Sequence, residues 1–328
     1  MVRIVFNMSF SRKFCVAPMM DWTDRHDRMF LRQFSKHTLL YTEMVTSAAL
    51  AHGDAAYLLQ HDVSEQPVAL QLGGCDPVQL AMAAKLGDDA GYQEINLNVG
   101  CPSARVQSGA FGACLMAEPE LVASCIKSMR SATSLPVTVK CRIGIDDKDS
   151  TEFLKSFIAI VANSGCDTFI IHARIAILSG LSPKENREVP PLNYQRVFDV
   201  KKSFPELEII INGGLKDIKT ISELGSKVDG VMVGREAYQN PFLLSKVDSQ
   251  IFGEKAEPLT RRDYLESYIP YMESELRKGT PLQHMTRHIL GLFKGEPGGK
   301  QFRRYLSENA FRKDAGISVL SDAIATLE

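Results

Sequence analysis

The segment QEINLNVGCPS, residues 93–103, contains the apolar residues Ile95, Leu97 and Val99 and then stops at a Gly-Cys-Pro turn. Its apolar residues are typical of a buried strand, and the glycine and proline that follow end the strand and begin a loop. Apolar, β-branched runs of this kind recur between residues 14 and 233, separated by stretches with apolar residues at helical spacing. This alternation predicts parallel strands with helices covering both faces of the sheet.

The pattern divides this part of the chain into eight predicted βα units. We expect strands over Phe14–Ala17, Leu39–Val45, Pro67–Leu72, Gln93–Asn98, Pro136–Cys141, Asp167–His172, Glu208–Asn212 and Asp229–Val233. We expect helices over Thr23–Phe34, Pro77–Leu86, Pro119–Ser131 and Ser150–Asn163. Eight units within about 235 residues match the usual size of an α/β protein of the (β/α)8 TIM-barrel type. An open doubly wound sheet is the structural alternative.

The alternation stops near Glu257, and only helical patterns follow. They cover Arg261–Lys278, Leu282–Lys294, Lys300–Arg312 and Val319–Leu327. Tyr264, Tyr268 and Met272 recur at helical spacing, so the first of these helices has one face to bury in a small bundle. The predicted domains are an N-terminal extension over residues 1–13, the TIM barrel over residues 14–252 and a C-terminal helical bundle over residues 253–328.

The composition is that of a globular protein, with 328 residues, 45% hydrophobic residues and a formal net charge of −1. No apolar run approaches the roughly 18 residues that a membrane span needs, and we find no signal peptide. The seven cysteines include no Cys-x-x-Cys pair, which favours free thiols over disulfides or a metal site. We therefore expect a cytoplasmic protein with no metal and no membrane partner.

Polar or glycine residues end nearly every predicted strand. In chain order, the strand-end residues are Pro18-Met19, Glu43, Gln71, Asn98, Lys140 with Arg142, His172, Asn212-Gly213-Gly214 and Gly234-Arg235. The carboxyl ends of barrel strands meet at one face, where barrel enzymes build their active sites. The predicted ring contains cations but no pair of carboxylates. Two long loops, Val99 to Ala117 and Ala173 to Pro191, leave the same face and are expected to carry function.

Glycines end the last two strands, in IINGG (residues 210–214) and VMVGR (residues 231–235). In barrels this position forms a phosphate cradle, because glycines let backbone N–H groups approach the anion. Lys140 and His172 follow apolar strand residues, where a charged group must have a partner or a ligand. A cofactor with a phosphate and an electron-rich ring would suit both side chains.

Cys101 differs from the other cysteines by its place. We expect Cys15, Cys125, Cys141 and Cys166 to be small buried residues. Cys101 instead stands between Gly100 and Pro102, past a strand end, so its thiol is expected to face the active-site mouth. There it could act as a nucleophile or as a proton donor.

Two groups of basic residues are the candidate contacts for a polyanion. Seven lie between Arg287 and Lys313, with Lys300 and Arg303 within one helical turn, and a second group belongs to the loop after strand six. That second group consists of Arg174, Lys184, Arg187 and Arg196. Neither group alone indicates nucleic acid, but a basic bundle beside a basic active-site loop is compatible with such a partner.

Several ordered motifs resemble those of the tRNA-dihydrouridine synthases, specifically the bacterial A-type, from about Phe14 to Asn309. The matching stretches are APMMDWTD, QLGG, INLNVGCPS, SGAFGACLM, VKCRIGID, IIHAR, GLSPKENREVPPL, INGG and VMVGREAYQNP. The resemblance implies reduction of the C5–C6 bond of uridine in the tRNA D-loop at positions 20 and 20a. It further implies FMN as a tightly bound cofactor and NADPH or NADH as the reductant. The helical bundle and one-to-one engagement of tRNA favour a monomer, and we infer no obligatory protein partner.

The same resemblance implies a role for each matching residue. The residues implied to bind FMN are Pro18, Met19, Met20, Gln71, Lys140, His172, Asn212, Gly213, Gly214, Gly234 and Arg235. Cys101 is implied to protonate C5 of uracil after hydride reaches C6, and Asn98 to contact the target nucleotide. The residues implied to contact tRNA elsewhere are Lys184, Arg187, Lys300 and Arg303.

The chain departs from the A-type pattern in two loops. Ile175 and Ile177 stand where the family usually has a lysine and a tryptophan, and Ala104 and Ala110 replace residues that are commonly polar. These differences concern tRNA affinity and loop order more than the cofactor site. Two alternatives stay open on the residues alone: a phosphate-binding barrel lyase with Lys140 as a Schiff base, and a non-catalytic tRNA chaperone.

Overall fold

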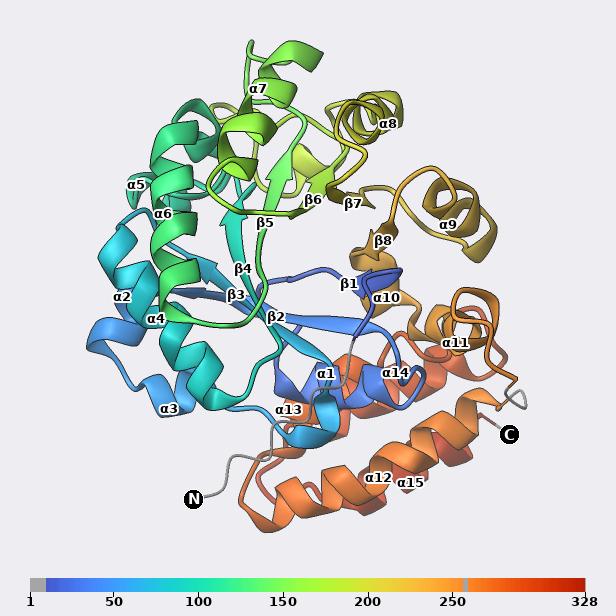
Figure 1. Cartoon of the computed structure of the whole chain (residues 1–328). Coiled ribbons are helices and arrows are strands. Elements are labelled where there is room, and N and C mark those ends of the chain that lie inside the picture. Colours follow the sequence, from blue (N-terminus) through green and yellow to red (C-terminus); the bar gives the residue numbers. More distant parts are fainter. Residues whose placement is uncertain (1–9, 256–258, 328) are drawn as a thin grey trace.

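The structure, a computed structural model, describes residues 10–255 and 259–327. Its strands form a closed, all-parallel barrel in chain order (Figure 1). The strands are β1 Phe14–Val16, β2 Leu39–Thr46, β3 Val68–Gly73, β4 Glu94–Val99, β5 Val137–Arg142, β6 Thr168–His172, β7 Glu208–Asn212 and β8 Gly230–Val233. All eight predicted strands are confirmed. Pairing of β1 with β8, as in Phe14 opposite Val231, closes the sheet and excludes the open alternative.

Helices cover the outside of the barrel. They are α1 Arg25–Arg32, α2 Ser47–His52, α3 Ala55–Leu58, α4 Pro77–Ala90, α5 Ala104–Ser108, α6 Pro119–Ala132, α7 Thr151–Ala162, α8 Tyr194–Ser203, α9 Ile218–Gly225, α10 Arg235–Gln239 and α11 Val247–Gln250. The α1 helix begins at Arg25, later than predicted, because the Asp24 side chain accepts hydrogen bonds from two first-turn N–H groups. The short helices α2, α3 and α5 were not predicted, since four to six residues carry no readable periodicity.

The C-terminal region consists of α12 Arg261–Arg277, α13 Leu282–Ile289, α14 Gly299–Asn309 and α15 Ile317–Ala325. The α13 helix is shorter than predicted because the chain turns near Gly291, which lies against the backbone of Gln239. The predicted domain boundary lies between α11 and α12, and its residues 256–258 are outside the described part of the chain, as are residues 1–9 of the predicted extension. No helix of the described residues is long and apolar enough to cross a membrane.

The α1 helix joins the barrel to the C-terminal helices (Figure 1). Arg25 Nη2 lies 2.6 Å from Glu275 of α12, and His26 Nδ1 lies 2.7 Å from the Tyr271 hydroxyl. Asp24 lies 2.7 Å from Arg287 Nη2 of α13. These consecutive polar contacts from one helix hold α12 and α13 beside the mouth of the barrel.

A buried ion pair fills the amino-terminal end of the barrel interior. Glu94 is fully buried and accepts hydrogen bonds from Arg12 Nε, the Tyr41 hydroxyl and the Thr138 hydroxyl, each at 2.6 Å. Arg12 also contacts Glu208, so it ties β4 to β7. The described part of the predicted N-terminal extension therefore closes the barrel floor, a role that its sequence did not indicate.

Candidate active site

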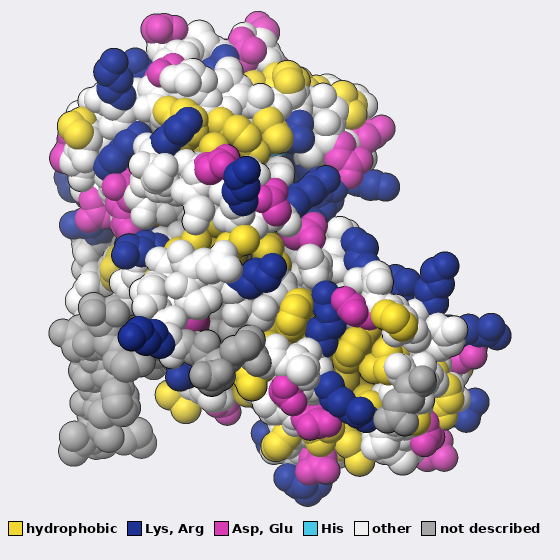
Figure 2. All heavy atoms as spheres, turned by 90° about the vertical axis from the view of Figure 1, so that its right-hand side faces the viewer, with side chains coloured by type: hydrophobic (Ala, Val, Ile, Leu, Met, Phe, Trp, Pro, Cys, Tyr) yellow, Lys and Arg dark blue, Asp and Glu magenta, His cyan; other side chains and the backbone are white. Residues whose placement is uncertain are grey.

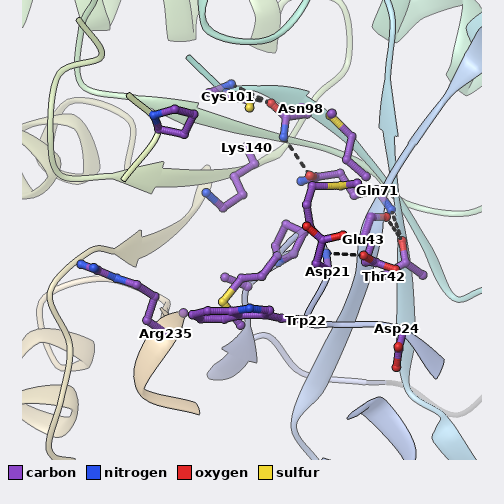
Figure 3. A pocket seen from close by; sticks show the side chains of 18 of the residues that line it. Asp21, Trp22, Asp24, Thr42, Glu43, Gln71, Asn98, Cys101, Lys140 and Arg235 are labelled. Carbon is purple, nitrogen blue, oxygen red and sulfur yellow. Dashed lines mark hydrogen bonds between the residues drawn. The ribbon is translucent and has the colours of Figure 1, made fainter. Parts of the chain in front are cut away.

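A cavity of about 1660 Å³ opens at the carboxyl ends of the strands. It is lined by every residue that the sequence analysis placed at a cofactor site, by Cys101 and Asn98, and by Arg187. The predicted tRNA contacts Lys184, Lys300 and Arg303 do not line it. Figure 3 shows Cys101 and Asn98 on one side of this cavity, Arg235 and Trp22 on the other, and Lys140 extending between them.

The turn that carries Cys101 is held by Asn98 at the end of β4. Asn98 Oδ1 accepts hydrogen bonds from the N–H groups of Gly100 and Cys101, both at 3.0 Å (Figure 3). Cys101 is half-buried and lines the cavity, with Sγ 3.6 Å from the Ser103 hydroxyl. Asn98 therefore fixes the backbone that presents the thiol, which is a role the sequence analysis did not assign to it.

Asn98 is itself fixed by side chains inside the barrel. Its Nδ2 donates to Gln71 Oε1 at 2.8 Å, and Gln71 Nε2 donates to Asn96 Oδ1 at 2.7 Å. Asn96 donates to the Thr138 hydroxyl at 2.8 Å, and Thr138 donates to Glu94. A continuous series of buried hydrogen bonds thus runs from the barrel floor to the Cys101 turn. The amide of Gln71 is engaged on both sides by this series.

Arg142 ties the two long loops together at the mouth. Its guanidinium donates to the carbonyl oxygens of Gly100 at 3.1 Å, Ile175 at 3.1 Å and Asn186 at 2.9 Å. Asn186 is fully buried and also holds both the N–H and the carbonyl of Ile177. The loop with the atypical Ile175 and Ile177 is therefore ordered by an asparagine that sequence reasoning missed. A buried asparagine inside a polar loop gives no periodic signal.

Lys140 and the neighbouring Arg142 form no ion pair with a carboxylate among the described residues. Burial and the neighbouring Arg142 lower the pKa of Lys140 to about 8. Burial, followed by the charges of Arg142 and Lys140, also lowers the pKa of His172 well below its usual range, so this imidazole is neutral at pH 7. His172 Nδ1 is buried with no hydrogen-bond partner among the described residues. An electron-rich, anionic ligand would satisfy both groups.

The glycines of the predicted phosphate cradle lie just after the ends of β7 and β8. Gly213 has φ 118° and Gly214 has φ 71°, which are conformations that other residues rarely adopt. A Cβ atom on Gly213 would lie 2.9 Å from His172 Cδ2. Asn212 Nδ2 donates to the Met232 carbonyl at 2.7 Å and joins the two strand ends. Arg235 stands at the edge of this cradle, paired with Glu188.

The backbone of Asp21 contacts the Glu43 carboxylate at the mouth of the cavity. Asp21 has φ 64°, and its N–H donates to Glu43 Oε1 at 2.5 Å (Figure 3). Burial raises the pKa of Glu43. Asp21 belongs to the loop after β1, so this contact with Glu43 of β2 was not part of the predicted ring of strand ends.

A family model described as dihydrouridine synthase (Dus) matches residues 15–327. The chain belongs to the dihydrouridine synthase family. The tRNA-dihydrouridine(20/20a) synthase of Vibrio cholerae is 56% identical to it over 321 residues, which cover 98% of each chain. The enzyme of that name from Escherichia coli K12 is 57% identical over 319 residues, covering 97% of this chain and 92% of the relative. That from Yersinia pestis is 58% identical over 315 residues, covering 96% and 91%.

The dihydrouridine synthase match extends over both the barrel and the C-terminal helices. It therefore includes the cation cluster, the glycine cradle, the Cys101 turn and the α13 helix that borders the cavity. Membership of this family of flavin-dependent oxidoreductases argues against the Schiff-base lyase, which belongs to another class of enzyme.

Proposed function

We propose that the protein reduces uridine to 5,6-dihydrouridine at positions 20 and 20a of the tRNA D-loop, with FMN as cofactor and NADPH as reductant. The observation that carries this proposal is the thiol of Cys101, presented near Lys140 and Arg142 in the cavity of a dihydrouridine synthase. Bound FMN, reduced by NADPH, would supply the hydride that reaches C6 of uracil.

The residues of the cavity fit FMN. Gly213, Gly214 and Gly234 with Arg235 would hold the phosphate, because they combine free backbone approach with a guanidinium. Lys140 and the unpartnered His172 Nδ1 would bind polar atoms of the cofactor. The remaining residues proposed to bind FMN are Pro18, Met19, Met20, Gln71 and Asn212.

Cys101 would donate the proton that C5 of uracil needs. Addition at C6 leaves negative charge at C5, and a positioned acid lowers the barrier to that step. Lys140, Arg142 and Arg187 are close enough to Cys101 to interact with its charge, so they would stabilise the thiolate left behind. Asn98, besides holding the Cys101 turn, is proposed to contact the target nucleotide from the same edge of the cavity.

The direct test uses the purified protein with FMN, NADPH and an unmodified tRNA transcript that has uridine at positions 20 and 20a. Mass spectrometry should find dihydrouridine at these two positions only when NADPH is present. Transcripts with cytidine at both positions serve as the control and should gain none. Tight tRNA binding without any dihydrouridine would reject the enzyme and favour the chaperone alternative.

Gly213→Ala should remove FMN from the protein. The new Cβ would crowd His172 at 2.9 Å, and the φ of 118° would strain the alanine. The flavin absorbance of the purified variant should be lost. Gly91→Ala is the matched control, because Gly91 also has positive φ, 96°, but its Cβ would meet nothing within 4 Å. Full flavin content in Gly213→Ala would place the phosphate elsewhere.

FMN affinity should fall as the pH rises through the pKa of Lys140, which is about 8. Below this pH the amine is protonated and attracts the anionic cofactor, and above it the amine is neutral. Because a phosphate is already ionised in this range, apparent affinity should weaken about tenfold between pH 7 and pH 9. Lys140→Met should bind FMN weakly at both values, with no pH step. A pH step retained in Lys140→Met, measured by flavin fluorescence titration, would assign the titration to another group.

Lys300 and Arg303 of α14, with Lys184 and Arg187 of the loop after β6, are proposed to contact tRNA phosphates. Lys300 is exposed, and Arg303 lies one turn along the same helix. Replacing both by glutamine should weaken tRNA binding and reduce the slope of log affinity against log salt by about 2. The control pair Lys127→Gln and Lys202→Gln removes two exposed cations from the outer helices α6 and α8. Equal tRNA affinity and salt slope in the two double variants would exclude α14 from the interface.

A further inference from the structure

Trp22, the single tryptophan of the chain, lines the active-site cavity. Its indole is stacked on the ring of Tyr238 in α10, with 4.5 Å between ring centroids and 12° between ring planes. Within the described part of the chain, neither ring belongs to or packs against the two hydrophobic clusters of the core. A large aromatic ring held outside the core at a cavity wall is placed to contact a ligand.

The stack is fixed from behind by the C-terminal helices. The Tyr238 hydroxyl donates to the Arg287 carbonyl at 3.3 Å, and the Tyr238 ring meets His288 edge-on at 5.7 Å. His288 in turn lies 3.0 Å from Asp24, two residues beyond Trp22. The indole is thus oriented before any ligand arrives, which lowers the entropic cost of binding to it.

Arg287 places a cation next to this aromatic surface. Its side chain is 45% exposed and lines the same cavity, while its Nη2 contacts Asp24 at 2.7 Å and its Nε contacts His288. A guanidinium has five N–H donors, so further donors stay free for a ligand. Of the seven basic residues between Arg287 and Lys313, Arg287 is the one that lines the cavity. An aromatic plane beside a guanidinium matches the base and phosphate of one nucleotide.

The cavity has room for more than the cofactor. Its volume of about 1660 Å³ exceeds the roughly 300–1000 Å³ of pockets for small ligands. Trp22 lies across the cavity from Cys101 and Asn98, with Lys140 between them (Figure 3). A base stacked on Trp22 is therefore not the uracil that Cys101 protonates.

On the side of the molecule that carries α9 and α11, Lys and Arg side chains flank the recess between the barrel and the C-terminal helices (Figure 2).

We propose that Trp22 and Arg287 form a subsite for one tRNA nucleotide close to the target uridine in sequence. The indole stacks on its base, and the guanidinium binds its phosphate. This inference rests on the proposed function, because it takes tRNA as the substrate. The subsite holds the RNA strand on the side of the cavity opposite Cys101, so the target base is aligned by two separated contacts.

The test measures how the holoenzyme binds and reduces unmodified tRNA after Trp22→Leu, Trp22→Phe and Arg287→Gln. Trp22→Leu should bind about tenfold more weakly, whereas Trp22→Phe keeps an aromatic plane and most of the affinity. Arg287→Gln should reduce the salt slope by about 1. Lys202→Gln, on the outer face of α8, is the control and should match the wild type. All variants should keep their FMN and their rate of flavin reduction by NADPH.

A second arm combines Trp22→Leu with tRNAs that lack one base, at each position within two nucleotides of the target. At one position, removing the base should weaken tRNA binding to the wild-type protein about tenfold. With that tRNA, Trp22→Leu should weaken binding no further, because the stacking contact is already lost. The subsite would be overturned if, at every position, the loss of tRNA affinity from the missing base and the loss from Trp22→Leu multiplied. It would also be overturned if Trp22→Leu lacked FMN. If the wild type itself makes no dihydrouridine, the proposed function fails; if it does and Trp22→Leu binds tRNA normally, only the subsite fails.

Discussion

Cys101→Ala should abolish most tRNA reduction while the reaction of NADPH with the bound flavin continues at the wild-type rate. Loss of a positioned general acid slows the step it serves by about 10²–10⁴-fold. The thiol lines the cavity on a turn held by Asn98, whereas the glycine cradle stands at the ends of β7 and β8. Removing the sulfur therefore takes away the proton donor without touching the residues proposed to bind FMN phosphate.

Anaerobic stopped-flow absorbance separates the two half-reactions. Flavin bleaching by NADPH reports the first, and reoxidation by unmodified tRNA reports the second. Cys114→Ala is the matched control, because Cys114 lies further along the same loop, is also half-buried and does not line the cavity. Equal slowing of both half-reactions in Cys101→Ala would contradict the proton-donor role, as would normal reoxidation by tRNA.

Glu94→Ala should destabilise the barrel more than any other single change proposed here. It would leave the Arg12 guanidinium buried with Glu208 alone, and the hydroxyls of Tyr41 and Thr138 without their acceptor. Breaking a buried ion pair by removing one partner costs about 3–5 kcal/mol. Urea unfolding followed by far-ultraviolet circular dichroism should show this loss as a lower transition midpoint.

Two further variants test the physical reason. Glu94→Gln keeps the shape and an acceptor oxygen but not the charge, so its loss of stability should be smaller than that of Glu94→Ala. Glu208→Gln removes the other carboxylate, which is partly exposed and can be replaced by water, and should cost about 1 kcal/mol or less. A midpoint for Glu94→Ala that equals that of Glu208→Gln would show that the buried network contributes little.

The order of the elements follows from local patterns in the sequence. Most β-strands contain an apolar run such as Phe169–Ile171, and longer helices combine apolar spacing with a capping residue such as Asp76 or Ser150. A closed barrel was predicted because eight consecutive βα units of this size match a TIM barrel, but only the pairing of β1 with β8 excludes an open sheet. The short helices and the exact ends of the longer helices could not be predicted from the sequence pattern, since they depend on single capping side chains such as that of Asp24.

The sequence predicted which strand-end residues belong to the site, but it did not predict the hydrogen bonds and ion pairs that connect them. Strand ends meet by topology, so the sequence placed Lys140, His172 and Gly213 at one mouth, and the cavity contains them. The contacts that give these residues their properties come from elsewhere in the chain. Asn186 reaches Arg142 from a loop 44 residues away, and Arg12 reaches Glu94 from 82 residues away.

By itself, then, the sequence determined the eight βα units, the glycines that end the last two strands and the family resemblance, because each rests on residue types at fixed spacing along the chain. Only the tertiary structure decided which side chains meet: Asn98 with the Cys101 turn, Asp21 with Glu43, and Trp22 with Tyr238. Such pairings depend on strand register, loop conformation and helix packing, which bring distant residues within a few ångströms. The local periodicity of the sequence does not contain those distances.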